Sequence, residues 1–185
     1  MRIFTAIGVV AVILLIGGVF VAASGNYNVA ADVRHWPLTE VVLQAVREQS
    51  IEAHSDNITA PADLDSQERI AKGARQYAEM CTGCHLAPGM ENTEMREGLY
   101  PQPPDLAQRK IDSPQEAFWI IKHGIKMTAM PAWGRTHDDG IIWNMVAFLR
   151  GLPEMTPAQY RKLTANANPE GHGHPRSDAR VHEHS

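Results

Sequence analysis

The strongest constraint in this sequence is the short motif Cys81-Thr82-Gly83-Cys84-His85, which holds both of the chain's cysteines. Cysteines this close together cannot join distant segments, so no disulfide framework holds the fold. Aromatic residues are sparse, and 12 prolines with 14 glycines indicate a loop-rich chain that needs something besides a large apolar core to stabilise it. The motif is therefore expected to serve a local purpose, and a large ligand held there would fill that need.

The spacing of the motif has a chemical reason if the ligand is a haem. Two thiols one helical turn apart, Cys81 and Cys84, can each add to one vinyl group on neighbouring pyrroles, and the imidazole of His85 then points at the iron. A thioredoxin-like redox pair would need an alternating strand and helix pattern, and a zinc site would need a second Cys or His pair at ligand spacing. We find neither pattern and no internal repeat, so the motif predicts one covalent haem c.

The second axial ligand of the iron is expected to come from far downstream, and Met130 is the residue that we predict. It lies in a loop between two well-marked helices, and Pro131 fixes the backbone just after the sulfur. A thioether is a soft ligand that raises the reduction potential relative to bis-His ligation. Met127 is the rival ligand, and a methionine in a loop otherwise most often fills a gap in the core. Two histidines, His123 and His137, fit better as surface residues near helix ends.

Residues 65–153 form the predicted domain, and its periodicity is helical. Helices are expected over about 66–80 with Asp65 or Ser66 as the cap, over 114–123 after Ser113, and over 138–150 before Gly151 and Pro153. Gly73 lies on the inner face of the first helix, where it lets another helix approach closely. Residues 86–112 are rich in proline and show no sustained period, which is typical of an ordered loop around a functional site.

Residues 66–152 resemble the class I cytochromes c, and within them the small domains of the cytochrome subunits of haem-copper oxidases. The resemblance rests on Gly73 and Tyr77 before the cysteine motif, on Pro103-Pro104-Asp105-Leu106, on Met130-Pro131-Ala132-Trp133-Gly134, and on a last helix with Trp143 and Phe148. It implies an all-α class I cytochrome c fold, after an N-terminal transmembrane helix, in which the first and last helices cross at Gly73. It also implies that a carbonyl of Pro103 or Pro104 accepts a hydrogen bond from His85 Nδ1, and that Leu106 lies against the porphyrin.

Residues 1–25 are predicted to be a transmembrane anchor or a signal. Residues 3–23 are apolar apart from Thr5, and at about 1.5 Å per helical residue they reach the ~30 Å thickness of the hydrocarbon core. The alternative is a cleaved leader, since Ala22-Ala23-Ser24 resembles a cleavage site. Arg2 before the apolar run places the haem domain outside by the positive-inside bias. We therefore expect a bacterial inner membrane protein with the domain in the periplasm, or a periplasmic protein if the leader is cleaved.

Residues 26–64 are expected to be a linker that contains an amphipathic helix over 37–54. Six of its residues share one stripe at helical spacing: Leu38, Val41, Val42, Ala45, Val46 and Gln49. A stripe of this kind must bury against something. We expect it to pack on the cytochrome domain, and the alternative is a docking face for a membrane partner.

Residues 154–185 are predicted to be a flexible, histidine-rich tail. Four of its histidines form two His-x-His pairs, His172 with His174 and His182 with His184. Neutral imidazoles so close together can hold Cu(II), Ni(II) or Zn(II). The alternative, which we favour, is that these histidines are only solvated.

The expected function is electron transfer without catalysis. The net charge of -4 and the scattered basic residues argue against a nucleic-acid partner. With His85 and Met130 on the iron, no coordination position is open to a substrate, so we predict a membrane-anchored carrier or a subunit of a respiratory redox complex, with redox proteins as partners. Two alternatives remain: a haem sensor with a displaceable Met130, and a metal-binding or assembly protein that uses a haem domain.

Overall fold

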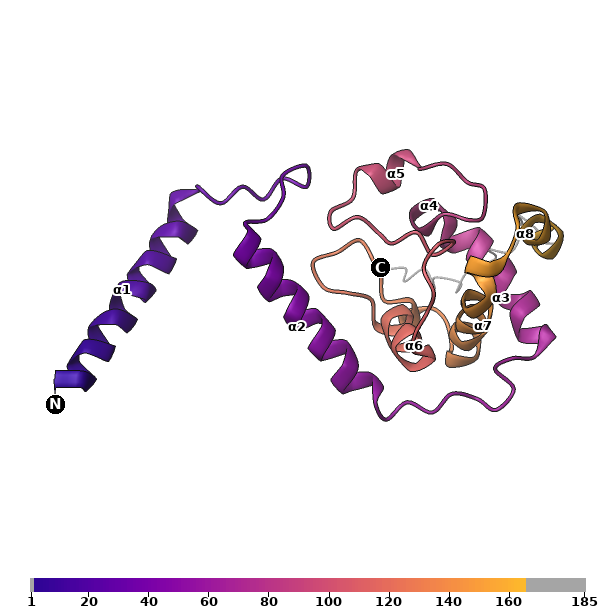
Figure 1. The fold of residues 1–185 in the computed structure, drawn as a ribbon, viewed down its shortest axis with the longest axis horizontal. Coiled ribbons are helices and arrows are strands. Elements are labelled where there is room, and N and C mark those ends of the chain that lie inside the picture. The colour runs from indigo at the N-terminus through magenta and orange to yellow at the C-terminus, as the bar shows by residue number, and fades with distance from the viewer. Residues whose placement is uncertain (1, 166–185) are drawn as a thin grey trace, which may run out of the picture.

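The computed structural model describes residues 2–165, and all regular elements in this part of the chain are helices (Figure 1). Two long helices come first, α1 (Arg2–Ser24) and α2 (Pro37–Ser55). The domain that follows contains α3 (Gln67–Met80), α4 (Thr82–His85), α5 (Glu94–Glu97), α6 (Pro114–His123), η1 (Trp133–Arg135), α7 (Asp139–Gly151), η2 (Leu152–Glu154) and α8 (Pro157–Thr164).

The three main helices of the domain begin close to where the sequence predicted, and each begins with a side-chain cap. The side chain of Ser66 accepts a hydrogen bond from the backbone NH of Arg69 at 3.4 Å. Ser113 caps α6 in the same way, and Asp138 caps α7. Each bond satisfies one of the amides that a helix leaves without an internal partner in its first turn. Asp65, the other candidate cap for α3, instead pairs with Arg150 at the end of α7.

The core of the domain is the crossing of α3 over α7, and it depends on a glycine. A Cβ atom on Gly73 would lie 1.9 Å from the backbone oxygen of Asn144, so only a residue without a side chain lets the two helices approach this closely. Next to the crossing, the rings of Tyr77 and Phe148 lie 5.3 Å apart, and both side chains are fully buried. The predicted crossing at Gly73 is confirmed.

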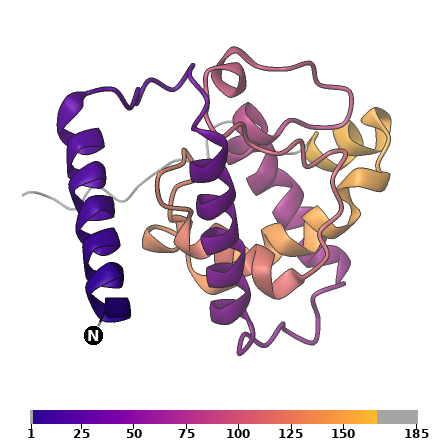
Figure 2. The ribbon, with the colours of Figure 1, turned by 60° about the vertical axis from the view of Figure 1, so that its left-hand side comes forward.

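Helix α6 packs between α7 and α2 (Figure 2). On the α7 side, the rings of Phe118 and Trp143 stack with their centroids 4.2 Å apart, and Lys122 forms an ion pair with Asp139. On the α2 side, the ring of His54 lies against Trp119 with a centroid separation of 5.7 Å. Helix α6 therefore joins the segment before the domain to the core.

The prediction that the apolar stripe of α2 packs on the domain is wrong. Four of its members are large apolar side chains that lie exposed: Leu38 at 75%, Val41 at 64%, Val42 at 51% and Val46 at 62%. The buried residues of α2 are Ile51 and Ser55, in its C-terminal half. Helices α3, α6 and α7 already bury one another's apolar faces, so the domain closes its core without the stripe.

Residues 157–164 fall in the segment for which we predicted a flexible tail, but they form α8. The side chain of Thr156 accepts from the NH of Gln159 at 3.2 Å, and the side chain of Gln159 accepts from the NH of Thr156 at 2.8 Å. This capping box starts the helix, and Tyr160 and Leu163 then pack on the core. The histidines of the predicted tail, His172, His174, His182 and His184, lie outside the described residues.

Replacing Gly73 by alanine is expected to destabilise the domain strongly. The new methyl group would meet backbone atoms of α7 that cannot rotate away, so the two helices must separate and the core loosens. We expect Gly73→Ala to lower the free energy of unfolding by about 3 kcal/mol, measured by urea denaturation of the haem-loaded protein.

Gly98→Ala is the matched control. The nearest atom to a Cβ at Gly98 is the backbone oxygen of Met95 at 3.7 Å, which is an ordinary contact. This substitution should change the free energy of unfolding by less than about 1 kcal/mol. Equal losses for the two variants would show that the crossing does not require a glycine.

Candidate functional site

The two cysteines and the histidine of the motif lie on one tight turn after α3, made of Cys81 and the single-turn helix α4. We call this segment the cysteine turn. Helix α3 ends at Met80, and the backbone amides of Cys84 and His85 both donate to the oxygen of Cys81, at 3.1 Å and 2.8 Å. Both cysteines are free thiols and are partly buried. The turn thus presents two thiols and one imidazole from a single short segment, as the spacing predicted.

Tyr77 stabilises this turn through hydrogen bonds from its hydroxyl. Its hydroxyl donates to the carbonyl oxygens of His85 at 3.2 Å and of Leu86 at 2.5 Å. Leu86 has a φ of 60°, a left-handed conformation that is unfavourable for a leucine. Burial raises the pKa of the Tyr77 hydroxyl well above its usual value, so it remains a hydrogen-bond donor. A buried donor therefore stabilises the strained residue that follows the histidine.

The imidazole of His85 is oriented by the proline-rich loop. Its Nδ1 lies 3.0 Å from the carbonyl oxygen of Pro104. A carbonyl only accepts hydrogen bonds, so Nδ1 carries the proton and Nε2 keeps a free lone pair. Burial lowers the pKa of His85, and the bond to Pro104 opposes that effect in part. The bond that the resemblance implied is confirmed, and Pro104 is the residue that accepts it.

Two further residues of the loop hold the site and were not predicted from the sequence. The Thr93 hydroxyl donates to the carbonyl of Gly83 at 2.5 Å, and Arg96 Nε donates to the carbonyl of Pro103 at 3.1 Å. The charge of Arg96 also contributes to the lowered pKa of His85. Both side chains bond to backbone oxygens, which leave no pattern in the sequence to predict the contact.

Met130 lies in a loop that two hydrogen bonds hold in one conformation. The NH of Ile125 donates to the oxygen of Met130 at 3.2 Å, and the NH of Met130 donates to the hydroxyl of Thr128 at 3.1 Å. Gly124 has a φ of 66°, and a Cβ there would lie 2.6 Å from the oxygen of Met130. The Met130 side chain is partly buried and packs on the core, as do Cys81 and Leu106. The loop and the cysteine turn thus border the same apolar interior.

Comparison with known proteins agrees with this geometry. A family model described as "Cytochrome C oxidase, cbb3-type, subunit III" matches residues 68–149. These residues form a class I c-type cytochrome domain. The match includes α3 through most of α7, with the cysteine turn, the proline-rich loop and the Met130 loop. No curated protein and no solved structure gives a significant match to the chain.

The cytochrome domain binds haem and transfers electrons, and its side chains suit that ligand. The neutral imidazole of His85 has its Nε2 lone pair free for iron, because Nδ1 is bonded to Pro104. Burial raises the pKa of the Cys81 thiol to about 12, and the neighbouring Cys84 adds to the effect. A redox-active cysteine pair has a lowered thiol pKa instead, so the structure argues against a thioredoxin-like role for these cysteines.

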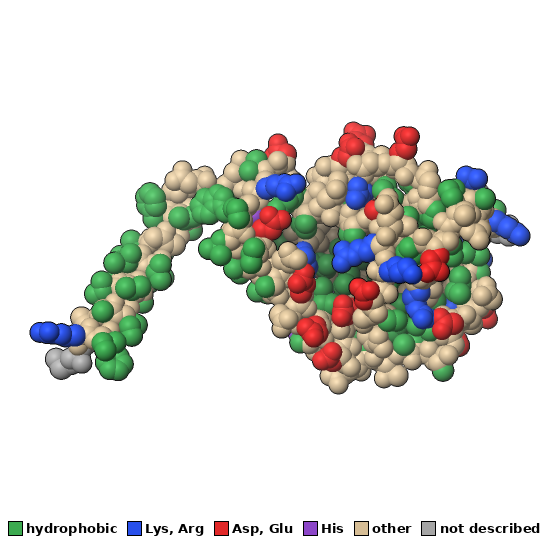
Figure 3. Space-filling view, viewed as in Figure 1, with side chains coloured by type: hydrophobic (Ala, Val, Ile, Leu, Met, Phe, Trp, Pro, Cys, Tyr) green, Lys and Arg blue, Asp and Glu red, His purple; other side chains and the backbone are tan. Residues whose placement is uncertain are grey.

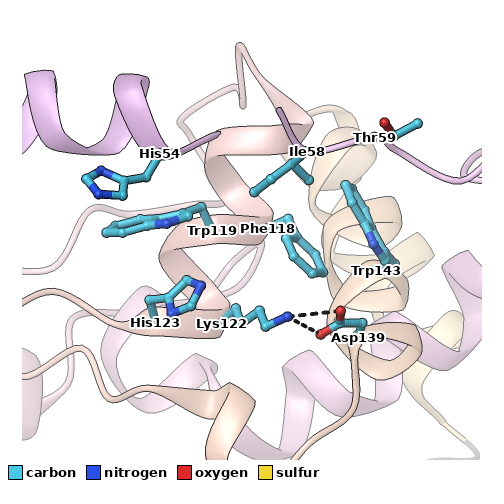
Figure 4. Close-up of a pocket in the computed structure, with 9 residues that line it drawn as sticks. All are labelled: His54, Ile58, Thr59, Phe118, Trp119, Lys122, His123, Asp139 and Trp143. Carbon is cyan, nitrogen blue, oxygen red and sulfur yellow. Dashed lines mark hydrogen bonds and ion pairs between the residues drawn. The ribbon is translucent and has the colours of Figure 1, made fainter. Parts of the chain in front are cut away.

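The cytochrome domain also has a hollow of about 560 Å³ on the side that faces α2 (Figure 4). Trp119 lies between the rings of His54 and His123, and Phe118 and Trp143 form the opposite part of the wall. The only lysine that lines the hollow, Lys122, is paired with Asp139. None of the lining residues belongs to the cysteine turn or the Met130 loop, so this hollow is separate from the haem site.

Tyr77→Phe is expected to destabilise the cytochrome domain by about 1–3 kcal/mol, because the substitution leaves the buried carbonyl of Leu86 without its donor. The measurement is urea denaturation of the haem-loaded protein. Tyr160→Phe serves as the control, since its hydroxyl forms no hydrogen bond among residues 2–165 and its pKa is raised to about 12 by burial. If both variants unfold at the same urea concentration, the bond from Tyr77 does not stabilise the turn.

Proposed function

We propose that this chain is a membrane-anchored, mono-haem c-type cytochrome that moves single electrons, as a carrier or as a subunit of a respiratory redox complex. Cys81 and Cys84 would form the thioether bonds to one haem, and His85 and Met130 would be its axial ligands. When bound, the haem supplies an iron that cycles between Fe(II) and Fe(III). The observation that carries the proposal is the bond from His85 Nδ1 to Pro104, which orients the imidazole and leaves Nε2 free for iron.

Exposure favours Met130 over Met127 as the second axial ligand. The Met127 side chain is 80% exposed and its backbone has a φ of 59°, so its thioether points to solvent. Met130 is partly buried, and its carbonyl and amide are both held within the loop. His123 is less suited because it lines the separate hollow beside Trp119.

The residues around the site hold both ligands in place before any change of redox state. His85 is fixed by Pro104 and Tyr77, and the loop of Met130 is fixed by Gly124 and Thr128. A site that changes little between the two redox states reorganises little during electron transfer. With both axial positions taken by side chains, no position is left for a substrate, so we infer a carrier or a non-catalytic subunit.

The membrane anchor in this proposal is α1. It is long and apolar enough to cross a bilayer, and none of its residues is buried against the rest of the described chain. Arg2 at its start favours an inside location for the N-terminus, which places the cytochrome domain on the periplasmic side. The partners would be redox proteins or a membrane oxidoreductase that meets the domain there.

Membrane extraction tests the anchor. The full-length, haem-loaded protein should stay in the membrane pellet after washing with alkaline carbonate, because α1 is held by apolar contacts that neither salt nor high pH disrupts. An intact mass measurement on the pelleted protein should show that residues 1–25 are still present. Recovery of the haem protein in the supernatant, with those residues missing, would instead establish a cleaved leader.

The optical spectrum tests the ligands. The oxidised native protein should show the weak long-wavelength charge-transfer band of sulfur-ligated ferric haem, and Met130→Ala should abolish it. Met127→Ala, which removes an exposed thioether of the same loop, should leave the band unchanged. The reduced native protein should bind carbon monoxide slowly and Met130→Ala should bind it rapidly, because the substitution opens a coordination position.

A native protein that lacks this band, or that binds carbon monoxide as fast as the variant does, would contradict His85 and Met130 ligation. The second axial position would then be open or held by another residue, and a ligand-binding role would replace the carrier role.

A further inference from the structure

An apolar surface that no other residue of 2–165 covers extends from the anchor helix to the domain. In the linker of residues 25–36, Val29 is 89% exposed and Trp36 is 50% exposed. The α2 stripe, which we define as Leu38, Val41, Val42 and Val46, continues this surface over the first half of α2. Figure 3 shows hydrophobic side chains running from α1 across the linker onto the side of α2 that faces away from the domain. Exposed apolar area of this extent indicates an interaction site.

The α2 stripe is on the face of the helix that the domain leaves free. Ile51, which is buried, is nine residues from Val42, and at 3.6 residues per turn that separation is two and a half turns. The two side chains therefore point in opposite directions. The domain packs on one face of α2, and the stripe faces away from it.

The linker is held to the cytochrome domain by a cluster of rings. The hydroxyl of Tyr27 lies 2.6 Å from His35 Nδ1, and the backbone NH of His35 donates to the hydroxyl of Tyr100 at 3.3 Å. The rings of His35 and Tyr100 lie 5.2 Å apart, and those of Tyr27 and Trp36 lie 5.1 Å apart. Since Tyr100 belongs to the proline-rich loop, the exposed apolar residues of the linker have a fixed place beside the haem-holding part of the domain.

We propose that the linker and the α2 stripe form a second membrane contact, in which Val29, Trp36 and the stripe lie in the lipid interface and hold the cytochrome domain against the outer surface of the bilayer. This inference rests on the proposed anchoring by α1. We assign lipid as the partner of this surface because the surface is continuous with α1, the helix that is proposed to lie in lipid. The linker spans at most about 40 Å when fully extended, so the start of α2 stays near the bilayer surface.

The side chains of the surface suit a lipid interface. Tyr27 and Trp36 are the residue types that concentrate where hydrocarbon meets headgroups. The exposed charges on α2 include the acidic residues Glu40, Glu48 and Glu52, which are not attracted to anionic headgroups. The contact is therefore apolar rather than electrostatic, and it should persist at high salt and on uncharged lipid.

The test separates the second contact from the anchor. A protease site is inserted between Gly25 and Asn26 of the full-length, haem-loaded protein, which is reconstituted into vesicles of phosphatidylcholine and cleaved after assembly. The vesicles are sedimented at low and high salt, and the haem absorbance is measured in the pellet and in the supernatant. We expect most of the cleaved cytochrome domain to remain with the vesicles at both salt concentrations.

Substitutions on α2 identify the surface. The triple variant Leu38→Ser, Val42→Ser, Val46→Ser should lower the ratio of bound to free domain at least about tenfold, since it removes most of the apolar area of the stripe. The control triple variant Glu40→Ser, Gln44→Ser, Glu48→Ser changes exposed polar residues of the same helix and should not lower the ratio. All six positions are exposed, and unchanged haem absorbance and helical circular dichroism verify that both variants fold.

Three results would overturn the inference. Release of the native domain into the supernatant after cleavage would show that the stripe does not bind lipid. Retention on membranes from the producing cells but not on pure lipid would assign the stripe to a membrane protein, and a domain dimer that the Leu38, Val42, Val46 variant cannot form would assign it to a second copy. If the uncut protein does not sediment with vesicles, the anchoring by α1 fails as well, which distinguishes the two proposals.

Discussion

The close contact between Gly73 and the backbone of Asn144 sets the position of α3, which carries the support for the cysteine turn. Because α3 lies directly on α7 there, Tyr77 is placed one turn further along α3 against Phe148, with its hydroxyl under the cysteine turn. That hydroxyl donates to the carbonyls of His85 and Leu86. The backbone of the cysteine turn is thereby held in place, and with it the base of the His85 side chain. A separation of the two helices would therefore displace the iron ligand as well as the core.

The ionisable groups of the site are kept neutral by burial rather than by ion pairs. Burial lowers the pKa of His85 and raises those of Cys81 and Tyr77, so all three favour their uncharged forms. An interior of this kind also disfavours an added positive charge on a bound iron, which is one means by which a protein raises the reduction potential of a haem. The surface ion pairs, such as Lys72 with Glu68, lie in solvent and contribute little to the charge state of these buried groups.

The parts of the fold that were predictable from the sequence are those with a local chemical cause. Ser66, Ser113 and Asp138 mark helix starts because short polar side chains satisfy free amides, and Gly73 marks a crossing because it has no side chain. The bond from His85 to Pro104 followed from the family resemblance. Met130 was already the predicted second ligand, with Met127 as its rival, and the burial of Met130 beside the exposure of Met127 favours the same residue in the proposal.

The wrong predictions concern the packing of one helix and the extent of the tail. Periodicity identified the apolar stripe of α2 but not what covers it, since the same pattern serves a core, a membrane or another protein. Helix α8 was missed although its capping box at Thr156 and Gln159 is visible in the sequence, because a polar composition outweighed a local signal. The contacts of Thr93 and Arg96 were not predictable, since their partners are backbone oxygens brought near only by the folded loop.

The backbone carbonyl of His85 accepts one more hydrogen bond, from the proline-rich loop. This bond makes the orientation of the His85 imidazole depend on whether the loop stays folded. The NH of Leu106 donates to this carbonyl at 3.1 Å, two residues after the proline that holds the imidazole. Opening of the loop would therefore break both bonds to His85 at once and would leave the strained Leu86 less restrained. Exchange of the Leu106 amide hydrogen with solvent would follow the same local unfolding event that frees the imidazole, so a single backbone amide reports on the stability of the iron ligand.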